Sequence, residues 1–313
     1  MGFFDGYRAS LKPRDVEEPV DYWVHRPLAY LFARVLYPTP ISPNLVTVLS
    51  IVAGLAAAAC LVREFPWHLQ IGGGLIFLSA VLDCADGQLA RMRKTSSAFG
   101  RMLDGCADLI VTLAVAPATV FVIWRKYATP SWLGFTVVGL CVVTMITSSW
   151  HTSMYDHYKN VWLRFTSPGF KEGEDYESAR ARWVAAAPRG LLGKLAWRVY
   201  LFYVKSQEDY VSSFDPNTVA AIGRLPAHTA DNEATYRTRA GKPWALLRQW
   251  LGFGSLMFGL AAFNALQIPE VYLVIRLVLL NGLFFLVVRP MQREASRAAL
   301  AEIAARDAAS PAE

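Results

Sequence analysis

The chain has 313 residues, of which 54% are hydrophobic and 18% are charged. Soluble domains carry about 25% charged residues, so this composition indicates a protein of the lipid bilayer rather than a pair of water-soluble domains. Lysine and arginine outnumber the acidic residues by 31 to 25. Because apolar runs dominate the chain, we expect this surplus to face an anionic membrane surface, and we expect no nucleic-acid partner.

Residues 1–43 form an arm that precedes the first apolar run. Within it, residues 20–37 mix apolar and basic side chains, which predicts an amphipathic helix lying at the membrane interface. The first residues include acidic side chains and prolines where a signal peptide would have its apolar core. We therefore predict no cleaved signal.

Six apolar runs follow, each near the roughly 20 residues that a helix needs to cross a bilayer. They cover residues 44–62, about 69–90, about 102–124, about 132–151, about 248–267 and about 270–289. The predicted fold class is therefore all-α: a polytopic integral membrane protein with six transmembrane helices and an N-terminal interfacial helix. Residues 44–289 would form one six-span domain.

A polar insert at residues 157–245 separates the fourth run from the fifth and is too long for a simple connector. Its segment LLGKLAWRVYLFYVKSQEDYV, residues 191–211, is typical of an amphipathic helix lying on a membrane. The insert could serve as an interfacial belt, a lid or a cytoplasmic cap. Residues 290–313 are predicted to be a cytoplasmic tail.

The basic residues predict the orientation of the spans. The arm, the loop at residues 91–101 and the tail are rich in Lys and Arg, whereas the opposite loops offer only Arg63, Arg125 and Lys126. The arm, the 91–101 loop and the tail are therefore expected in the cytoplasm, which an even number of spans allows.

Four aspartates flank that loop, in the segment LDCADGQLARMRKTSSAFGRMLDGCADLIV at residues 82–111. The first two are three residues apart and the last two are four apart, so each pair shares one helix face. Four carboxylates in a poorly solvated site stay ionised together only if cations neutralise them. Hard divalent cations prefer such oxygen ligands, so we expect Mg²⁺ or Mn²⁺, with two ions, at Asp83, Asp86, Asp104 and Asp108.

Small and basic residues between the aspartates predict a phosphate-binding pocket. Gly87, Ala90 and Gly100 leave room for a bulky ligand to approach the backbone. Arg91 lies at the cytoplasmic end of its helix, where a guanidinium can grip a phosphate with two hydrogen bonds. Together with two cations, this site would suit holding a pyrophosphate and stabilising the charge that develops during group transfer.

The complete spacing resembles a known signature. Asp83-x2-Asp86-Gly87-x2-Ala90-Arg91-x8-Gly100-x3-Asp104-x3-Asp108 is similar, at all eight fixed positions, to that of the CDP-alcohol phosphotransferase (CDP-alcohol phosphatidyltransferase) family. The resemblance implies a six-span membrane enzyme, usually a homodimer. Such enzymes move a phosphoalcohol or phosphatidyl group from a CDP-linked donor to a hydroxyl in phospholipid biosynthesis and release CMP. The resemblance covers the six spans loosely and says little about the insert.

The resemblance also implies roles for individual residues. Asp83, Asp86 and Asp104 would ligate the divalent cations. Asp108 would be the general base that deprotonates the acceptor hydroxyl, with Asp104 contributing to its site. The remaining signature positions would line the CDP pocket: Gly87, Ala90, Arg91 and Gly100.

The start of the first span, PTPISPNLVTVLS, is similar to that of many family members, in which a Pro-Asn pair and a Thr one turn later approach the nucleotide. Here these residues are Pro43, Asn44 and Thr47. Asn44 is equally suited to capping a helix, and Thr47 to being an ordinary helix residue.

The substrates divide the family into two branches. One uses CDP-diacylglycerol with a polar acceptor, and the other uses a CDP-linked head group with a lipid acceptor. The arm and the segment DCADGQLAR look somewhat more like the inositol-phosphate-lipid branch with a CDP-linked head group.

Two polar features lie outside the signature. Residues 148–160, SSWHTSMYDHYKN, could contact an acceptor or be an ordinary interfacial segment. Arg276 is a cation inside the sixth run, which could bind a phosphate, pair with an aspartate or extend its side chain to an interface.

Two other classes also use membrane aspartates. Intramembrane prenyltransferases bind Mg²⁺-pyrophosphate, but through DxxxD patterns on separated helices. A cation transporter could use the four carboxylates as its ion site, but it would not need the Ala-Arg pair or the glycine before Asp104.

Overall fold

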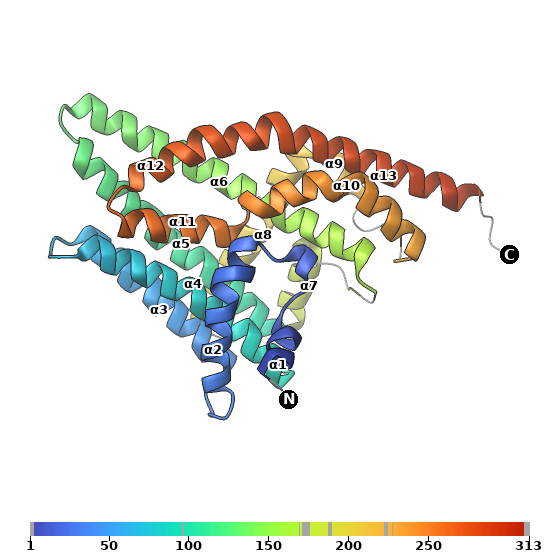
Figure 1. Ribbon diagram of the computed structural model, residues 1–313, viewed down its shortest axis with the longest axis horizontal. Helices are drawn as coiled ribbons and strands as arrows, with labels where there is room; N and C mark the ends of the chain where they lie inside the picture. The colour runs from blue at the N-terminus through green and yellow to red at the C-terminus, as the bar shows by residue number, and fades with distance from the viewer. Residues whose placement is uncertain are drawn as a thin grey trace. The chain divides into compact units, whose positions relative to one another are not determined.

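A computed structural model describes residues 3–95, 97–168, 170, 176–186, 190–221, 225–226 and 228–309 (Figure 1). These described residues form helices and no strands, which confirms the predicted all-α class. The N-terminal arm contains four helical segments: α1 (Phe3–Ser10), η1 (Arg14–Val16), η2 (Asp21–His25) and α2 (Arg26–Leu36).

Within the described residues, six helical stretches are long and apolar enough to cross a membrane, as predicted: Pro43–Val62, His68–Arg93, Phe99–Tyr127, Ser131–Thr166, Ala230–Ala265 and Pro269–Arg306. The protein is therefore an integral membrane protein. The first four correspond to α3 (Pro43–Val62), α4 (His68–Arg93), α5 (Ala98–Tyr127) and α6 (Ser131–Thr166). The fourth helix thus continues well past the apolar run that ends near residue 151.

The described part of the insert is mostly helical and contains the end of α6, then α7 (Tyr176–Ala186), α8 (Leu191–Phe214), α9 (Pro216–Ala221) and most of α10 (Ala230–Trp250). The amphipathic segment at residues 191–211 is therefore a helix. The chain ends with α11 (Phe253–Ala265), α12 (Pro269–Val274), η4 (Ile275–Leu280), η5 (Leu283–Val288) and α13 (Arg289–Ala309).

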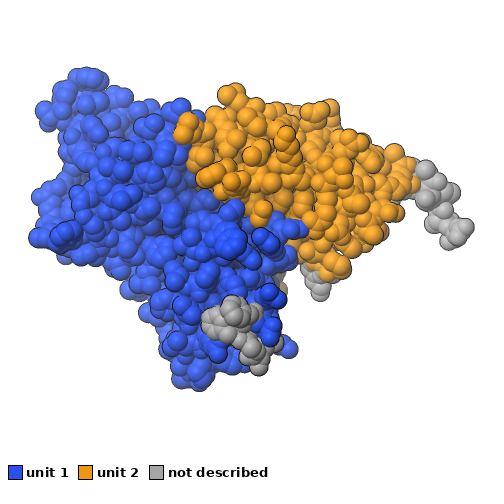
Figure 2. Space-filling view, viewed as in Figure 1, with its two compact units in different colours: residues 1–146, 253–278 blue, residues 147–252, 279–313 orange. Residues whose placement is uncertain are grey.

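The chain divides into two compact units (Figure 2). Unit 1 contains Met1–Ile146 and Phe253–Val278, and unit 2 contains Thr147–Gly252 and Leu279–Glu313. The complete aspartate motif and the N-terminal arm therefore belong to unit 1.

The helix α2 is amphipathic, as its sequence predicts. Ala29 and Ala33 are fully buried, whereas Trp23 just before the helix and Leu31 and Val35 within it are exposed. A row of exposed apolar side chains is typical of a helix at a membrane interface.

Local signals set the ends of the helices that carry the motif. Ser42 caps α3, because its hydroxyl accepts a hydrogen bond from the Leu45 amide at 3.3 Å. Lys94 ends α4 in the left-handed conformation, with φ of 55°. Ser97 then caps α5 by accepting a hydrogen bond from the Gly100 amide at 2.9 Å. The short loop between Lys94 and Ser97 brings the polar ends of α4 and α5 together.

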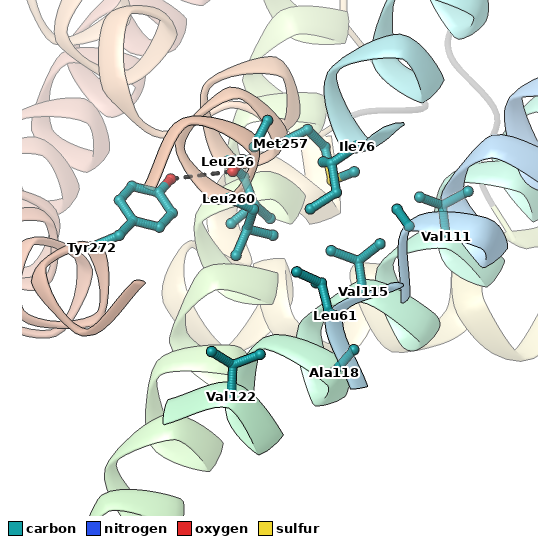
Figure 3. Close-up of a cluster of buried hydrophobic side chains, with 12 residues drawn as sticks. Leu61, Ile76, Val111, Val115, Ala118, Val122, Leu256, Met257, Leu260 and Tyr272 are labelled. Atoms are coloured by element: carbon teal, nitrogen blue, oxygen red, sulfur yellow. Dashed lines mark hydrogen bonds between the residues drawn. The ribbon is translucent and has the colours of Figure 1, made fainter. Parts of the chain in front are cut away.

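A cluster of buried apolar side chains from α3, α4, α5, α11 and α12 forms the core of unit 1 (Figure 3). Gly73 allows α4 to approach α11 closely, because a Cβ atom there would lie 2.5 Å from the Ala261 carbonyl oxygen. Tyr272 donates a hydrogen bond to the Leu256 carbonyl at 3.3 Å, at the edge of this cluster.

Unit 2 has an aromatic core of its own. The Trp244 ring stacks on Tyr155 and on Trp162, with ring centroids 5.7 and 5.8 Å apart. Buried Asp215 accepts hydrogen bonds from Tyr158 and Thr218, each at 2.5 Å, and so ties α6 to the start of α9.

Candidate active site

The helices α4 and α5 bring three of the four motif aspartates together. Asp83, Asp86 and Asp104 each offer a carboxylate oxygen, and these oxygens all lie within 4.8 Å of one another. Asp86 is buried, Asp83 is partly buried and Asp104 is exposed. Three oxygen donors at this separation fit a hard divalent cation such as Mg²⁺ or Mn²⁺.

The fourth aspartate, Asp108, lies outside that group of three. It lines a small adjoining cavity together with Asp83, Ser50 and Ser79. Asp108 is one helical turn beyond Asp104, and it is not among the three residues whose carboxylate oxygens lie within 4.8 Å of one another. The geometry thus separates one carboxylate from the three that could share a cation.

A hydrogen bond from α3 orients one of the three carboxylates. The Thr47 hydroxyl donates to Asp86, and both side chains are buried. Side chains that hold a metal ligand in position strongly affect metal affinity. Thr47 therefore contacts the carboxylate cluster itself and not only the space for a nucleotide.

A cavity of about 320 Å³ opens beside the three carboxylates. All the residues that the sequence assigned to the CDP pocket line it: Asn44, Thr47, Gly87, Ala90, Arg91 and Gly100. The absence of a side chain at Gly100 leaves room beside Asn44, because a Cβ atom at position 100 would lie 3.3 Å from the Asn44 side-chain oxygen. The predicted pocket residues thus surround one space, although they come from three different helices.

Arg91 is held by the N-terminal arm. Its Nε donates a hydrogen bond to the Ser10 carbonyl oxygen at 2.5 Å. One of its terminal nitrogens is buried and has no hydrogen-bond partner among the described residues. A buried guanidinium nitrogen without a partner is costly, and an anionic ligand in the cavity would satisfy it.

Three further basic residues line the cavity, although the motif did not assign them to it: Lys12, Arg26 and Arg101. In the sequence they count only toward the basic charge of the arm and of the 91–101 loop, which predicts orientation. No spacing rule could have placed Lys12 and Arg26 at the site, because both lie more than 50 residues before Asp83, whereas Arg101 directly follows Gly100 of the motif.

Arg276 lies elsewhere in unit 1. It is buried, and it donates a hydrogen bond to the Tyr272 hydroxyl at 3.2 Å. It does not line the cavity beside the aspartates. The observed contact therefore gives Arg276 a structural partner on its own helical stretch.

The polar segment at residues 148–160 lies in unit 2. Ser148 and His151 are buried, and the His151 ring packs 4.7 Å from that of Phe284. Lys159 pairs with Asp156 one turn before it. These contacts place the segment within the packing of unit 2.

Comparison with known proteins identifies the segment that carries the motif. Residues 40–166 match the family model described as CDP-alcohol phosphatidyltransferase. The resemblance drawn from the motif is therefore confirmed for these residues.

Several curated relatives are similar over the same part. The chain is 36% identical over 104 residues to a CDP-diacylglycerol–serine O-phosphatidyltransferase of Mycobacterium leprae, covering 33% of each chain. It is 33% identical over 108 residues to a phosphatidylinositol phosphate synthase of Mycobacteroides abscessus, covering 34% of this chain and 46% of the relative.

A third relative is a CDP-diacylglycerol–glycerol-3-phosphate 3-phosphatidyltransferase of Cereibacter sphaeroides, 43% identical over 67 residues, or 21% of this chain and 30% of the relative. The chain thus matches less than half the length of each of these proteins.

Proposed function

We propose that this protein, whose residues 40–166 match the CDP-alcohol phosphatidyltransferase family, transfers a phosphatidyl or phosphoalcohol group from a CDP-linked donor to a hydroxyl. The observation that carries the proposal is the cavity in which three clustered carboxylates face Arg91 and the small residues of the motif. The donor would be CDP-diacylglycerol or a CDP-linked head group, and the reaction would serve phospholipid synthesis.

The divalent cations would be held by Asp83, Asp86 and Asp104. When bound, they would supply the positive charge that balances the pyrophosphate of the donor and the leaving CMP. Thr47 fixes the orientation of Asp86, so this part of the site is organised before a substrate arrives. Either Mg²⁺ or Mn²⁺, as a pair of ions, suits these oxygen donors.

Arg91 and its neighbours would bind the nucleotide part of the donor. The unpartnered nitrogen of Arg91 would bond a phosphate oxygen, while Gly87 and Ala90 leave the backbone of α4 accessible. Asn44 and Gly100 form the facing wall.

Asp108 would act as the general base. The acceptor hydroxyl gives its proton to the Asp108 carboxylate as its oxygen bonds to the phosphorus of the transferred group. The bond from that phosphorus to the CMP oxygen breaks, and CMP leaves with the electron pair. The position of Asp108 outside the group of three supports this separate role.

The site is proposed to open to the cytoplasm, because the basic arm, the 91–101 loop and the tail would all lie on that side. The protein is proposed to act as a homodimer surrounded by membrane lipids. The boundaries of its parts, an arm at 1–43, a six-span domain at 44–289 with the insert at 157–245, and a tail at 290–313, remain predictions.

The experiment is an assay of CMP release by the full chain in lipid nanodiscs with Mg²⁺. CDP-diacylglycerol, CDP-inositol, CDP-choline, CDP-ethanolamine and CDP-glycerol are each offered with small alcohols and with lipid acceptors. We expect one pair to turn over. Absence of CMP from every pair, with protein that still binds Mn²⁺, would contradict the proposal.

Two variants then separate the roles of the carboxylates. Asp108→Asn is expected to abolish turnover while Mn²⁺ binding stays within a fewfold of wild type. Asp83→Asn is expected to lose both turnover and Mn²⁺ binding. Loss of Mn²⁺ binding in Asp108→Asn as well would show that Asp108 is a metal ligand and not the base alone.

A further inference from the structure

The N-terminal arm contributes two basic side chains to the wall of the cavity. Lys12 and Arg26 line it together with Asp83, Asp86 and Asp104. Neither basic residue belongs to the eight-position signature, and both lie outside the segment at residues 40–166 that matches the family.

Ser10 and Arg26 of the arm make three hydrogen bonds with α4. The Ser10 carbonyl oxygen accepts the Nε hydrogen of Arg91 at 2.5 Å, and the Ser10 hydroxyl accepts a hydrogen bond from Gln88 at 3.2 Å. Arg26 donates to the carbonyl oxygen of Cys84 at 3.3 Å, between the first two motif aspartates. Ser10, Gln88 and Arg26 are buried, so these contacts fix the arm against the helix that carries the motif.

One buried carboxylate holds both basic residues in place. Glu17 accepts a hydrogen bond from the Lys12 main-chain amide with one oxygen and from Arg26 Nε with the other, each at 3.2 Å. Glu17 is only 2% exposed and Arg26 only 6%. Burying this ion pair is costly, so its location at a cavity wall calls for a reason other than stability.

The charges around the cavity indicate what it would take. Four basic side chains line it, against three carboxylates: Lys12, Arg26, Arg91 and Arg101 against Asp83, Asp86 and Asp104. Cations bound to the carboxylates would cancel the negative charge, and the four basic side chains would then dominate the field inside the cavity. Such a field attracts phosphate groups.

We propose that Lys12 and Arg26, positioned by Glu17, form a phosphate-binding subsite of this cavity. The subsite takes a phosphate group of a substrate, either in the pyrophosphate of the CDP-linked donor or on a phosphorylated acceptor alcohol. The inference rests on the proposed function and adds the arm to the part of the site that the motif supplies.

Lys12 allows a test in a folded protein, because its side chain is exposed. The variants are Lys12→Gln, Lys12→Arg and Arg26→Lys, in the full chain in nanodiscs. The matched control is Arg14→Gln, an exposed basic residue of the same arm that stacks on Tyr22 at 5.2 Å and does not line the cavity. Thermal unfolding of every variant is measured first.

The first measurement is KM and kcat for both substrates of the pair that turns over. We expect Lys12→Gln to raise one KM about tenfold, the scale of one lost charge-assisted hydrogen bond, with kcat within about twofold. Lys12→Arg should return this KM to the wild-type value, and Arg26→Lys should raise the same KM. Arg14→Gln should leave the KM of both substrates unchanged.

The second measurement is equilibrium binding of CDP and of inorganic phosphate in the presence of Mg²⁺, which needs no turnover. If the subsite holds the donor, Lys12→Gln weakens CDP binding by the same factor as the KM. If it holds an acceptor phosphate, CDP binding is unchanged, inorganic phosphate binds more weakly, and the preference for the phosphorylated acceptor over its free alcohol falls.

The two proposals fail in different ways. A wild-type protein that releases no CMP contradicts the proposed function, and the binding measurements then still decide the subsite. Unchanged binding of both probes in Lys12→Gln and Arg26→Lys, or no binding of either probe by wild type, overturns the subsite.

Discussion

The Thr47 hydroxyl on α3 donates a hydrogen bond to the Asp86 carboxylate on α4, and both residues are buried. A carboxylate that ligates a cation depends on such a neighbour for its orientation. The first span thus takes part directly in the candidate metal site.

Replacing Thr47 should therefore weaken metal binding. Thr47→Val keeps the shape of the side chain but removes the hydroxyl, and we expect a loss of about 10- to 100-fold in Mn²⁺ affinity. Thr47→Ser should retain the affinity. Calorimetric titration with Mn²⁺ measures the effect, with Thr136→Val as control, since Thr136 is exposed and its hydroxyl donates to the Trp132 carbonyl oxygen in its own helix. Equal affinities in Thr47→Val and wild type would show that Asp86 needs no help from α3.

The contact between α4 and α11 should be sensitive to one added methyl group. In Gly73→Ala, the new Cβ would lie 2.5 Å from the Ala261 carbonyl oxygen and 2.7 Å from the Ala265 amide nitrogen. We expect a loss of about 1–3 kcal/mol in the free energy of unfolding, because backbone atoms cannot yield cheaply. Unfolding in detergent, followed by tryptophan fluorescence, measures it.

The neighbouring glycine provides the control. A Cβ atom at Gly74 would meet nothing within 4 Å. Gly74→Ala should therefore be neutral or stabilise by up to about 1 kcal/mol, because alanine favours a helix. Similar destabilisation by both substitutions would mean that helix α4 tolerates no change in this turn and that the approach of α11 is not the cause.

Arg93 should stabilise the loop before α3. Its guanidinium donates to four carbonyl oxygens, those of Leu36, Tyr37, Thr39 and Ile41, at 2.6, 3.0, 2.8 and 2.5 Å. We expect Arg93→Ala to lower the free energy of unfolding by about 2 kcal/mol. Because this loop leads to Asn44, CDP binding should weaken too. Arg63→Ala, at an exposed arginine at the far end of α3, should change neither the free energy of unfolding nor CDP binding.

Glu18 should make stability depend on pH. Its carboxylate is buried and accepts hydrogen bonds from the Gly254 and Ser255 amides, each at 2.8 Å. Burial and then the nearby charge of Asp21 raise the pKa of Glu18 from its ordinary 4.5 to about 8, although the hydrogen bonds act in the opposite direction.

The sign follows from proton binding. Between pH 4.5 and about 8 the folded protein holds a proton on Glu18 that the unfolded chain has lost, so stability should fall as the pH rises through this window. Asp21 does not oppose this fall. Burial alone would raise its pKa, but the hydrogen bond to His25 and nearby positive charges lower it, so its contribution is lost only in acid, below its ordinary 3.8.

Glu18→Gln tests this prediction, because glutamine mimics the protonated carboxyl. The thermal midpoint of wild type should fall between pH 5.5 and 8.5, and the fall should be smaller in Glu18→Gln. Asp5→Asn, at an exposed carboxylate in α1, should follow wild type. Identical pH profiles for wild type and Glu18→Gln would place the titrating group elsewhere.

The sequence by itself determined the six spans and the location of the candidate site. The apolar runs act locally, since each one must satisfy its own backbone in lipid by forming a helix. The aspartates and small residues of the motif lie on two successive helices joined by a short loop. Their spacing therefore already implies that Asp83, Asp86 and Asp104 meet and that Gly87, Ala90 and Arg91 share their cavity.

Only the tertiary structure decided which distant residues join them. Ser10, Lys12 and Arg26 reach the site because the arm folds back on α4, and Glu18 meets Gly254 across 236 positions of the chain. It also placed Asp108 outside the group of three carboxylates. No periodicity or spacing encodes such contacts, because they depend on how helices far apart in the sequence pack together.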